Sequence, residues 1–122
     1  MNNITNEQIA KCLFNGNYKM GKLCGGLHKV DNVKQRNIEL PDKLPDNATL
    51  FLYMNNNIVL YVAGGKCYVN TTAKQHLTPI QVASLDYCLD NNKLPVENVA
   101  IEWQGKSGGG VQLCDKVAGM FN

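Results

Sequence analysis

The residues best suited to chemistry lie in the last quarter of the chain, where a lysine and a serine follow a glycine. The segment from Ala100 to Gly105-Lys106-Ser107 satisfies the relaxed Walker A pattern, whose loop amides and lysine bind phosphates while its hydroxyl binds magnesium. In a P-loop the residues after Gly-Lys open a helix. Here residues 100–103 alternate like a strand, and three further glycines follow Ser107. We therefore do not expect a nucleotide-binding P-loop.

The same segment keeps the features of a simpler ligand site. The candidate ligand-binding residues are Trp103, Gly105, Lys106, Ser107, Gly108, Gly109 and Gly110. Glycines ahead of a helix expose successive backbone N–H groups that bind anions, and a tryptophan beside them offers a stacking surface for a planar ligand. The alternative is a flexible connection to a last helix, with Trp103 as a core anchor. Residue types alone leave both interpretations open.

A cysteine nucleophile is the second hypothesis. Cys24 is followed by Gly25 and Gly26, which leave its surroundings open, and His28 is close in sequence. Catalysis would require a lowered thiol pKa and a base within hydrogen-bonding reach, neither of which spacing can show. A cysteine in a glycine turn without any catalytic role is the alternative. A small cysteine-dependent enzyme using Cys24 and His28 is therefore the rival to a binding function.

Other catalytic and metal sites find less support in the sequence. Residue types that bind zinc are present at Cys24, His28, Cys67 and His76. The sequence contains no close pair of cysteines, so it gives little support for a zinc site. The carboxylates form no positioned acid–base pair. We therefore assign no catalytic residues, no metal ligands and no cofactor from the sequence.

The cysteines also bear on the compartment. The five are Cys12, Cys24, Cys67, Cys88 and Cys114. An odd number without close pairs is not typical of a disulfide framework and indicates the reduced thiols of a cytoplasmic protein. Apart from Cys24, these cysteines fall on or beside apolar faces, which predicts small core residues.

Two capping boxes predict where helices begin. Thr5-x-x-Gln8 starts a helix of about ten residues, and Thr78-x-x-Gln81 starts one that runs to about residue 90, with Pro79 at its first position. The second helix has an apolar stripe that we expect to pack on a sheet. The stripe consists of Val82, Leu85 and Leu89, with Ile80, Ala83 and Tyr87 predicted to widen it.

Apolar runs separated by Asn and Gly turns predict the strands. Residues 49–54, 58–62 and 66–69 are expected to form a three-stranded meander, residues 98–103 a half-buried strand, and residues 18–20 and 27–30 two short strands. The predicted fold class is α+β, an antiparallel sheet built on the meander and covered by two or three helices. We expect a single domain over residues 1–122, with residues 1–40 as an optional N-terminal arm.

Composition narrows the function classes. The formal charge is only +2, and every cationic side chain except Arg36 is a lysine. Because the recognition of phosphates and bases favours arginine, nucleic acid is not an expected partner. No apolar run is long enough to span a membrane, and the first residues lack a signal-peptide pattern. The leading hypothesis is a small intracellular, non-enzymatic binding module that acts through a protein interface or a small anionic or nucleotide ligand. The doubly apolar meander predicts a homo-oligomer, and heavy Asn and Lys usage suggests phage or mobile-element origin.

Overall fold

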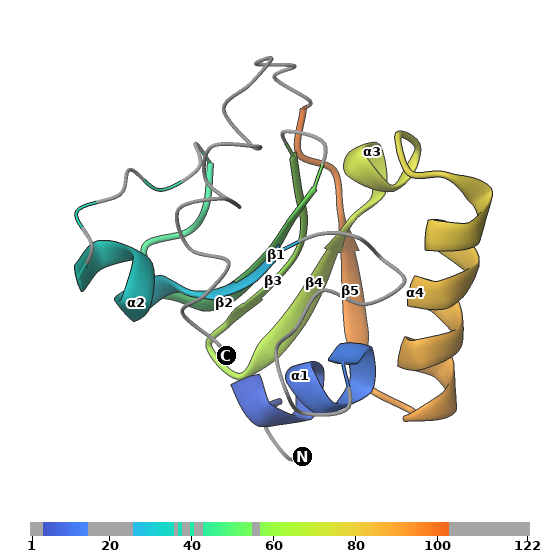
Figure 1. Ribbon diagram of the computed structural model, residues 1–122, viewed down its shortest axis with the longest axis horizontal. Helices are drawn as coiled ribbons and strands as arrows, with labels where there is room; N and C mark the ends of the chain where they lie inside the picture. The colour runs from blue at the N-terminus through green and yellow to red at the C-terminus, as the bar shows by residue number, and fades with distance from the viewer. Residues whose placement is uncertain are drawn as a thin grey trace.

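The computed structural model describes residues 4–14, 26–35, 37, 40, 43–54 and 57–102 (Figure 1). The helices are α1 (Asn6–Phe14), α2 (Val30–Gln35), α3 (Thr71–Lys74) and α4 (Pro79–Asn91). The strands are β1 (Gly26–Lys29), β2 (Ala48–Met54), β3 (Asn57–Ala63), β4 (Lys66–Asn70) and β5 (Val96–Val99). The described part of the chain is thus an α+β fold with a mostly antiparallel sheet.

The five strands form one sheet in the order β1-β2-β3-β4-β5. The first three pairings are antiparallel, and β5 runs parallel to β4. Strands are present where residues 49–54, 58–62 and 66–69 were predicted, but the sheet differs from the antiparallel one expected around them. It is larger because β1 adds an edge beside β2. It is mixed because β5 runs parallel to β4, and a parallel neighbour needs a crossover connection, which here contains α3 and α4.

Local geometry inside the sheet follows from particular residues. Gly64 and Gly65 close the β3–β4 hairpin with φ values of 60° and 75°, the two positive angles that a type I′ turn requires. In the β2–β3 pairing, Leu60 lies opposite Leu52 and Ile58 lies opposite Tyr53. The residue between Leu60 and Ile58 has no counterpart on β2, so β3 contains a bulge at this point.

The first predicted helix is confirmed as α1, together with its capping box. The Thr5 backbone N–H donates to Oε1 of Gln8 at 2.8 Å, and the Gln8 N–H donates to Oγ1 of Thr5 at 3.2 Å. The N–H of Ile4 donates to the carbonyl of Gly65 at 2.6 Å, so the segment entering α1 is held against the β3–β4 hairpin.

The second predicted helix is confirmed as α4. The N–H of Thr78 donates to Oε1 of Gln81 at 2.9 Å, and the reciprocal bond to Oγ1 of Thr78 is 3.2 Å. At its other end Lys93 adopts a φ of 51°, and the N–H of Leu94 donates to the carbonyl of Leu89 at 3.2 Å. This is a Schellman ending with a lysine at the position that glycine prefers.

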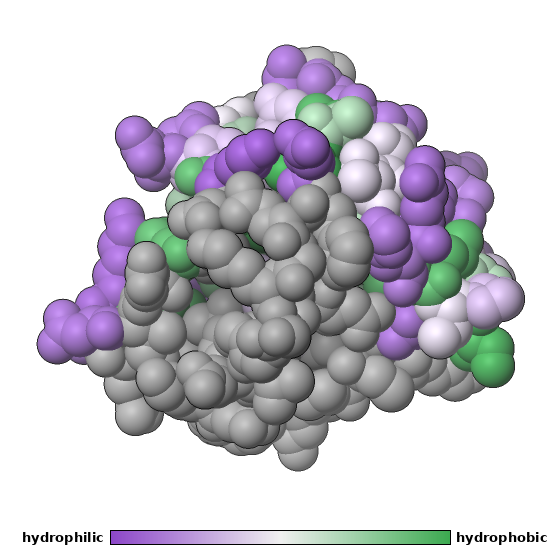
Figure 2. Space-filling model, turned by 90° about the horizontal axis from the view of Figure 1, so that it is seen from above, coloured by the Kyte–Doolittle hydropathy of each residue, from purple (hydrophilic) through white to green (hydrophobic). Residues whose placement is uncertain are grey.

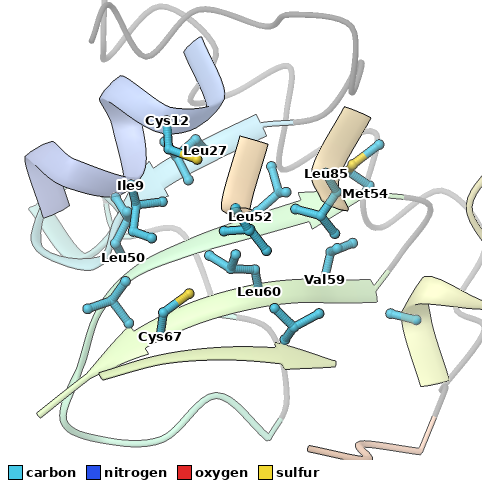
Figure 3. Packing of buried hydrophobic residues seen from close by; sticks show 14 of the residues in the cluster. Ile9, Cys12, Leu27, Leu50, Leu52, Met54, Val59, Leu60, Cys67 and Leu85 are labelled. Carbon is cyan, nitrogen blue, oxygen red and sulfur yellow. The ribbon is translucent and has the colours of Figure 1, made fainter. Parts of the chain in front are cut away.

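The first core cluster lies between the sheet and the helices α1, α3 and α4 (Figure 3). Its side chains come from both layers: Ile9 and Cys12 of α1, Leu27 of β1, Leu50 and Leu52 of β2, Val59 and Leu60 of β3, Cys67 of β4 and Leu85 of α4. These side chains point toward one another in Figure 3. Their burial removes apolar surface from water and is the main stabilising term of this layer.

The second core cluster lies on the opposite face of the sheet, where Phe51, Tyr53 and Tyr61 pack with Val30 and Val33 of α2. Tyr53 and Tyr61 are only 9% and 8% exposed, and every residue of β3 is buried. The apolar character of both faces is therefore accounted for within one chain. The apolar faces of the sheet therefore do not support the predicted homo-oligomer.

The predicted width of the apolar stripe of α4 is wrong. Leu85 and Leu89 are buried, but Ile80 is 72% and Tyr87 68% exposed, and Ala83 between them is exposed as well. A helix that lies on one side of a sheet buries a narrow stripe and leaves its other side to solvent. Helix α2 was not predicted, since its six residues carry no cap signal and its valines favour strands in isolation.

Candidate functional site

The predicted ligand-binding residues Trp103 and 105–110 lie outside the described residues, so the structure does not test them. The predicted strand at residues 98–103 is shifted, because β5 spans Val96–Val99. The structure does describe how the chain leaves β5, and this exit is organised by a buried side chain that the sequence did not single out.

That side chain is Asn70, at the carboxyl end of β4 and 2% exposed. Its Nδ2 donates to the carbonyl of Ile58 at 2.9 Å, and its Oδ1 accepts from the N–H of Thr72 at 3.1 Å and of Ile101 at 3.0 Å. The Oγ1 of Thr71 adds a bond to the carbonyl of Val99 at 3.0 Å. Asn70 thus joins β3, the start of α3 and the segment that follows β5.

The placement of Asn70 has a topological consequence. Because β4 and β5 are parallel, their carboxyl ends lie at the same edge of the sheet, and Ile101 is fixed there by Asn70. In open α/β sheets, small ligands bind outside the carboxyl ends of the parallel strands, at the point where the strand order reverses. The signal for this junction was the sequence Asn70-Thr71-Thr72, an N-cap pattern directly after a strand.

The histidine of the hypothetical cysteine enzyme is buried. His28 is 1% exposed and lies on β1 opposite Phe51 of β2. The centroids of the two rings are 5.3 Å apart, and the angle between the ring planes is 57°. Burial lowers the pKa of His28 to about 4, so the ring is neutral at pH 7 and does not face solvent. Cys24 lies outside the described residues. The placement of His28 therefore lends the enzyme hypothesis no support.

The zinc ligands considered above are not brought together. Cys67 is completely buried in the first core cluster, while His76 is exposed in the connection after α3 and His28 lies on the opposite face of the sheet. No group of three metal-binding side chains occurs among residues 4–14, 26–35, 43–54 and 57–102.

The described surface has one feature that core packing does not explain. Ile80, Ala83 and Tyr87 follow one another at helical spacing along the solvent side of α4, and we call them the α4 outer face. Within the described ranges, Ile80 and Tyr87 are the large hydrophobic residues left exposed. Figure 2 shows hydrophobic side chains at the surface on the side where α4 lies in Figure 1, among hydrophilic ones.

Similarity to known proteins does not indicate a function for the α4 outer face. Comparisons with protein-family models, curated proteins and solved structures find no match. Among the described helices, none has the length and apolar character needed to cross a bilayer.

Proposed function

We propose that this chain is a non-enzymatic binding module that acts through a protein interface, and that the interface is the α4 outer face. The observation that carries the proposal is the exposure of Ile80 and Tyr87 on one side of α4, because exposed apolar side chains that form a patch rimmed by polar residues mark protein interaction sites. Tyrosine is also enriched among the residues that dominate binding energy. The occupant we propose is a second copy of the chain.

The spacing on α4 suits a twofold pairing. An antiparallel α4 pair with its axis between Ala83 and Ser84 would bring Ile80 of each copy against Tyr87 of the other. The two residues at the crossing point have small side chains, which allows the helix backbones to approach closely. The pattern is thus self-complementary about its own centre.

The charges on α4 do not oppose such a pair. Asp86 forms an ion pair with Lys74 of the same chain, with 2.6 Å between Nζ and Oδ1. Asp90 lies about 10 Å along the helix from the proposed axis, so the two copies would hold their Asp90 carboxylates roughly 20 Å apart. That separation exceeds the Debye length of about 8 Å at physiological salt. Repulsion between the copies is therefore weak.

The area of the α4 outer face limits how strongly two copies of the chain are expected to associate. Ile80 and Tyr87 together offer roughly 300 Å², well below the approximately 800 Å² per partner of a standard interface. We therefore expect weak, concentration-dependent association in which these two side chains supply most of the apolar contact.

Cysteine crosslinking tests the geometry. An Ala83→Cys variant should give an interchain disulfide under mild oxidation, because position 83 lies beside the proposed axis. Asp90→Cys, on the same helix and also exposed, is the matched control and should not crosslink, and the wild-type chain gives the background from its native thiols. Non-reducing electrophoresis separates the outcomes. Equal dimer yields from the two variants would argue against the pairing.

A second candidate function is suggested by the Asn70 junction. Ile101, two residues before the candidate residue Trp103, is held at the carboxyl edge of the parallel pair β4 and β5, and in open α/β sheets ligands bind outside the carboxyl ends of the strands. We infer a small anionic or nucleotide ligand for that edge. Thermal shifts with a nucleotide panel should then disappear in Trp103→Ala and Lys106→Ala. The absence of any shift across the panel would remove this candidate.

A further inference from the structure

The second core cluster continues across β4 and β5, where it is only partly buried. Tyr68 of β4 stacks on Tyr61 of β3, with 4.9 Å between the ring centroids and 19° between the ring planes. Tyr61 is buried, whereas Tyr68 is half-buried. Val99 of β5 and Ile101 after it pack against the same cluster and are half-buried as well. We call Tyr68, Val99 and Ile101 the β4–β5 patch.

Helix α2 packs on the same face of the sheet, at its other end. It contacts β1 and β2, and the strand order places these strands toward the edge opposite β5 (Figure 1). Helices α1, α3 and α4 pack on the reverse face, over the first core cluster. The β4–β5 patch therefore lies on the face that carries α2, at the end farthest from α2 in the strand order.

The chain leaves the sheet directly beside this patch. The N–H of Ile101 donates to Oδ1 of Asn70 at 3.0 Å, and Oγ1 of Thr71 donates to the carbonyl of Val99 at 3.0 Å. These two bonds fix the exit at the carboxyl end of β5. Residues 103–122 follow from this point and lie outside the described residues, so the segment that they form starts next to the β4–β5 patch.

The sequence after the glycines is amphipathic. Four apolar residues recur at helical spacing and share one side of a helix; they are Val111, Cys114, Val117 and Phe121. Gln112 and Lys116 fall on the opposite side. Because a short helix gains most of its stability from the packing of its apolar side, this pattern predicts a helix that needs an apolar surface to cover.

We propose that residues 111–121 form a helix that docks, through its apolar side, on the β4–β5 patch of the same chain. Such a helix is about 16 Å long, close to the length of about 16 Å that the five residues of β4 span. If it runs back along β5, Cys114 lies one turn from its start and near Val99, at the carboxyl end of the strand. This face is opposite to the one on which α4 packs, so the docking does not depend on pairing through the α4 outer face.

A crosslink to a native thiol tests the docking in the full chain. Val99→Cys under mild oxidation should give an intrachain disulfide between position 99 and Cys114, since such a bond requires Cα atoms within about 7 Å. Asn98→Cys is the matched control, because it changes the next residue of β5, which is exposed and points to the other face. Peptide mapping and non-reducing electrophoresis separate the outcomes. The absence of this link, an interchain link to Cys114 of a second copy, or equal yields from both variants would overturn the proposal.

Stability measurements test the apolar side of the helix without any crosslink. Val117→Asp should lower the melting temperature by roughly 5–10 °C, because it places a charge against the β4–β5 patch. Gln112→Asp introduces the same charge on the opposite side of the helix and should change the melting temperature by less than about 2 °C. A Val117→Asp variant that melts with Gln112→Asp and the wild-type chain would contradict the docking.

Discussion

At the scale of single residues, His28 couples stability to pH. Its pKa is lowered to about 4 in the folded chain because burial disfavours the charged ring, whereas the unfolded chain binds a proton near pH 6.5. Between these values the unfolded state takes up a proton that the folded state does not. This contribution to stability is therefore complete above about pH 6.5 and is lost as the pH falls toward 4.

His28→Leu should consequently flatten this part of the pH profile. In the wild-type chain we expect the His28 contribution to the free energy of unfolding to decrease by up to about 3 kcal/mol between pH 6.5 and 4. His76→Gln, which changes an exposed histidine, is the matched control variant. Urea denaturation at several pH values measures the difference. A His28→Leu profile parallel to that of the wild type would show that His28 is not the group responsible.

Lys93 offers a second test at this scale. Its φ of 51° is strained for a residue with a side chain, and glycine adopts it freely. Lys93→Gly should raise the free energy of unfolding by about 0.5–1 kcal/mol. Lys93→Ala keeps the strain and should give no gain. Thermal unfolding compares the two, and a Lys93→Gly variant no more stable than Lys93→Ala would refute the Schellman ending.

At the scale of elements, Asn70 is the residue that joins separate parts of the fold. Asn70→Ala would leave the carbonyl of Ile58 and the amides of Thr72 and Ile101 without these bonds in a buried setting, so we expect a loss of about 2–4 kcal/mol. Asn98→Ala, on the exposed side of the adjacent strand, should stay within about 0.5 kcal/mol. Chemical denaturation of both variants provides the measurement. A loss as small for Asn70→Ala as for Asn98→Ala would contradict the proposed junction.

The elements also show what the sequence could predict. The two capping boxes and the Gly64-Gly65 turn are local, because each is specified by residues within four positions of one another, and all three are found where expected. The parallel pairing of β5 and the burial of only one side of α4 depend on contacts between distant segments. No pattern of neighbouring residues encodes those contacts, so the mixed sheet and the α4 outer face became visible only in the structure.

At the scale of the whole molecule, the structure changes the basis of the interface prediction. The sequence suggested that the doubly apolar strands needed a second subunit, but both faces of the sheet are buried within one chain. Among the residues that the structure describes, the large hydrophobic side chains that are exposed lie instead on α4. The candidate ligand residues at 103–110 and Cys24 stay predictions, because they lie outside the described residues.

Sedimentation velocity over a wide concentration range tests the central claim most directly. We predict that the weight-average sedimentation coefficient of the wild-type chain rises with concentration, and that Ile80→Ser/Tyr87→Ser remains monomeric throughout. Asp31→Ser/Gln35→Ser, which changes two exposed residues of α2, is the control and should associate like the wild type. A wild-type chain that stays monomeric at every concentration, or a double variant on α4 that associates as strongly as the wild type, would contradict the proposal.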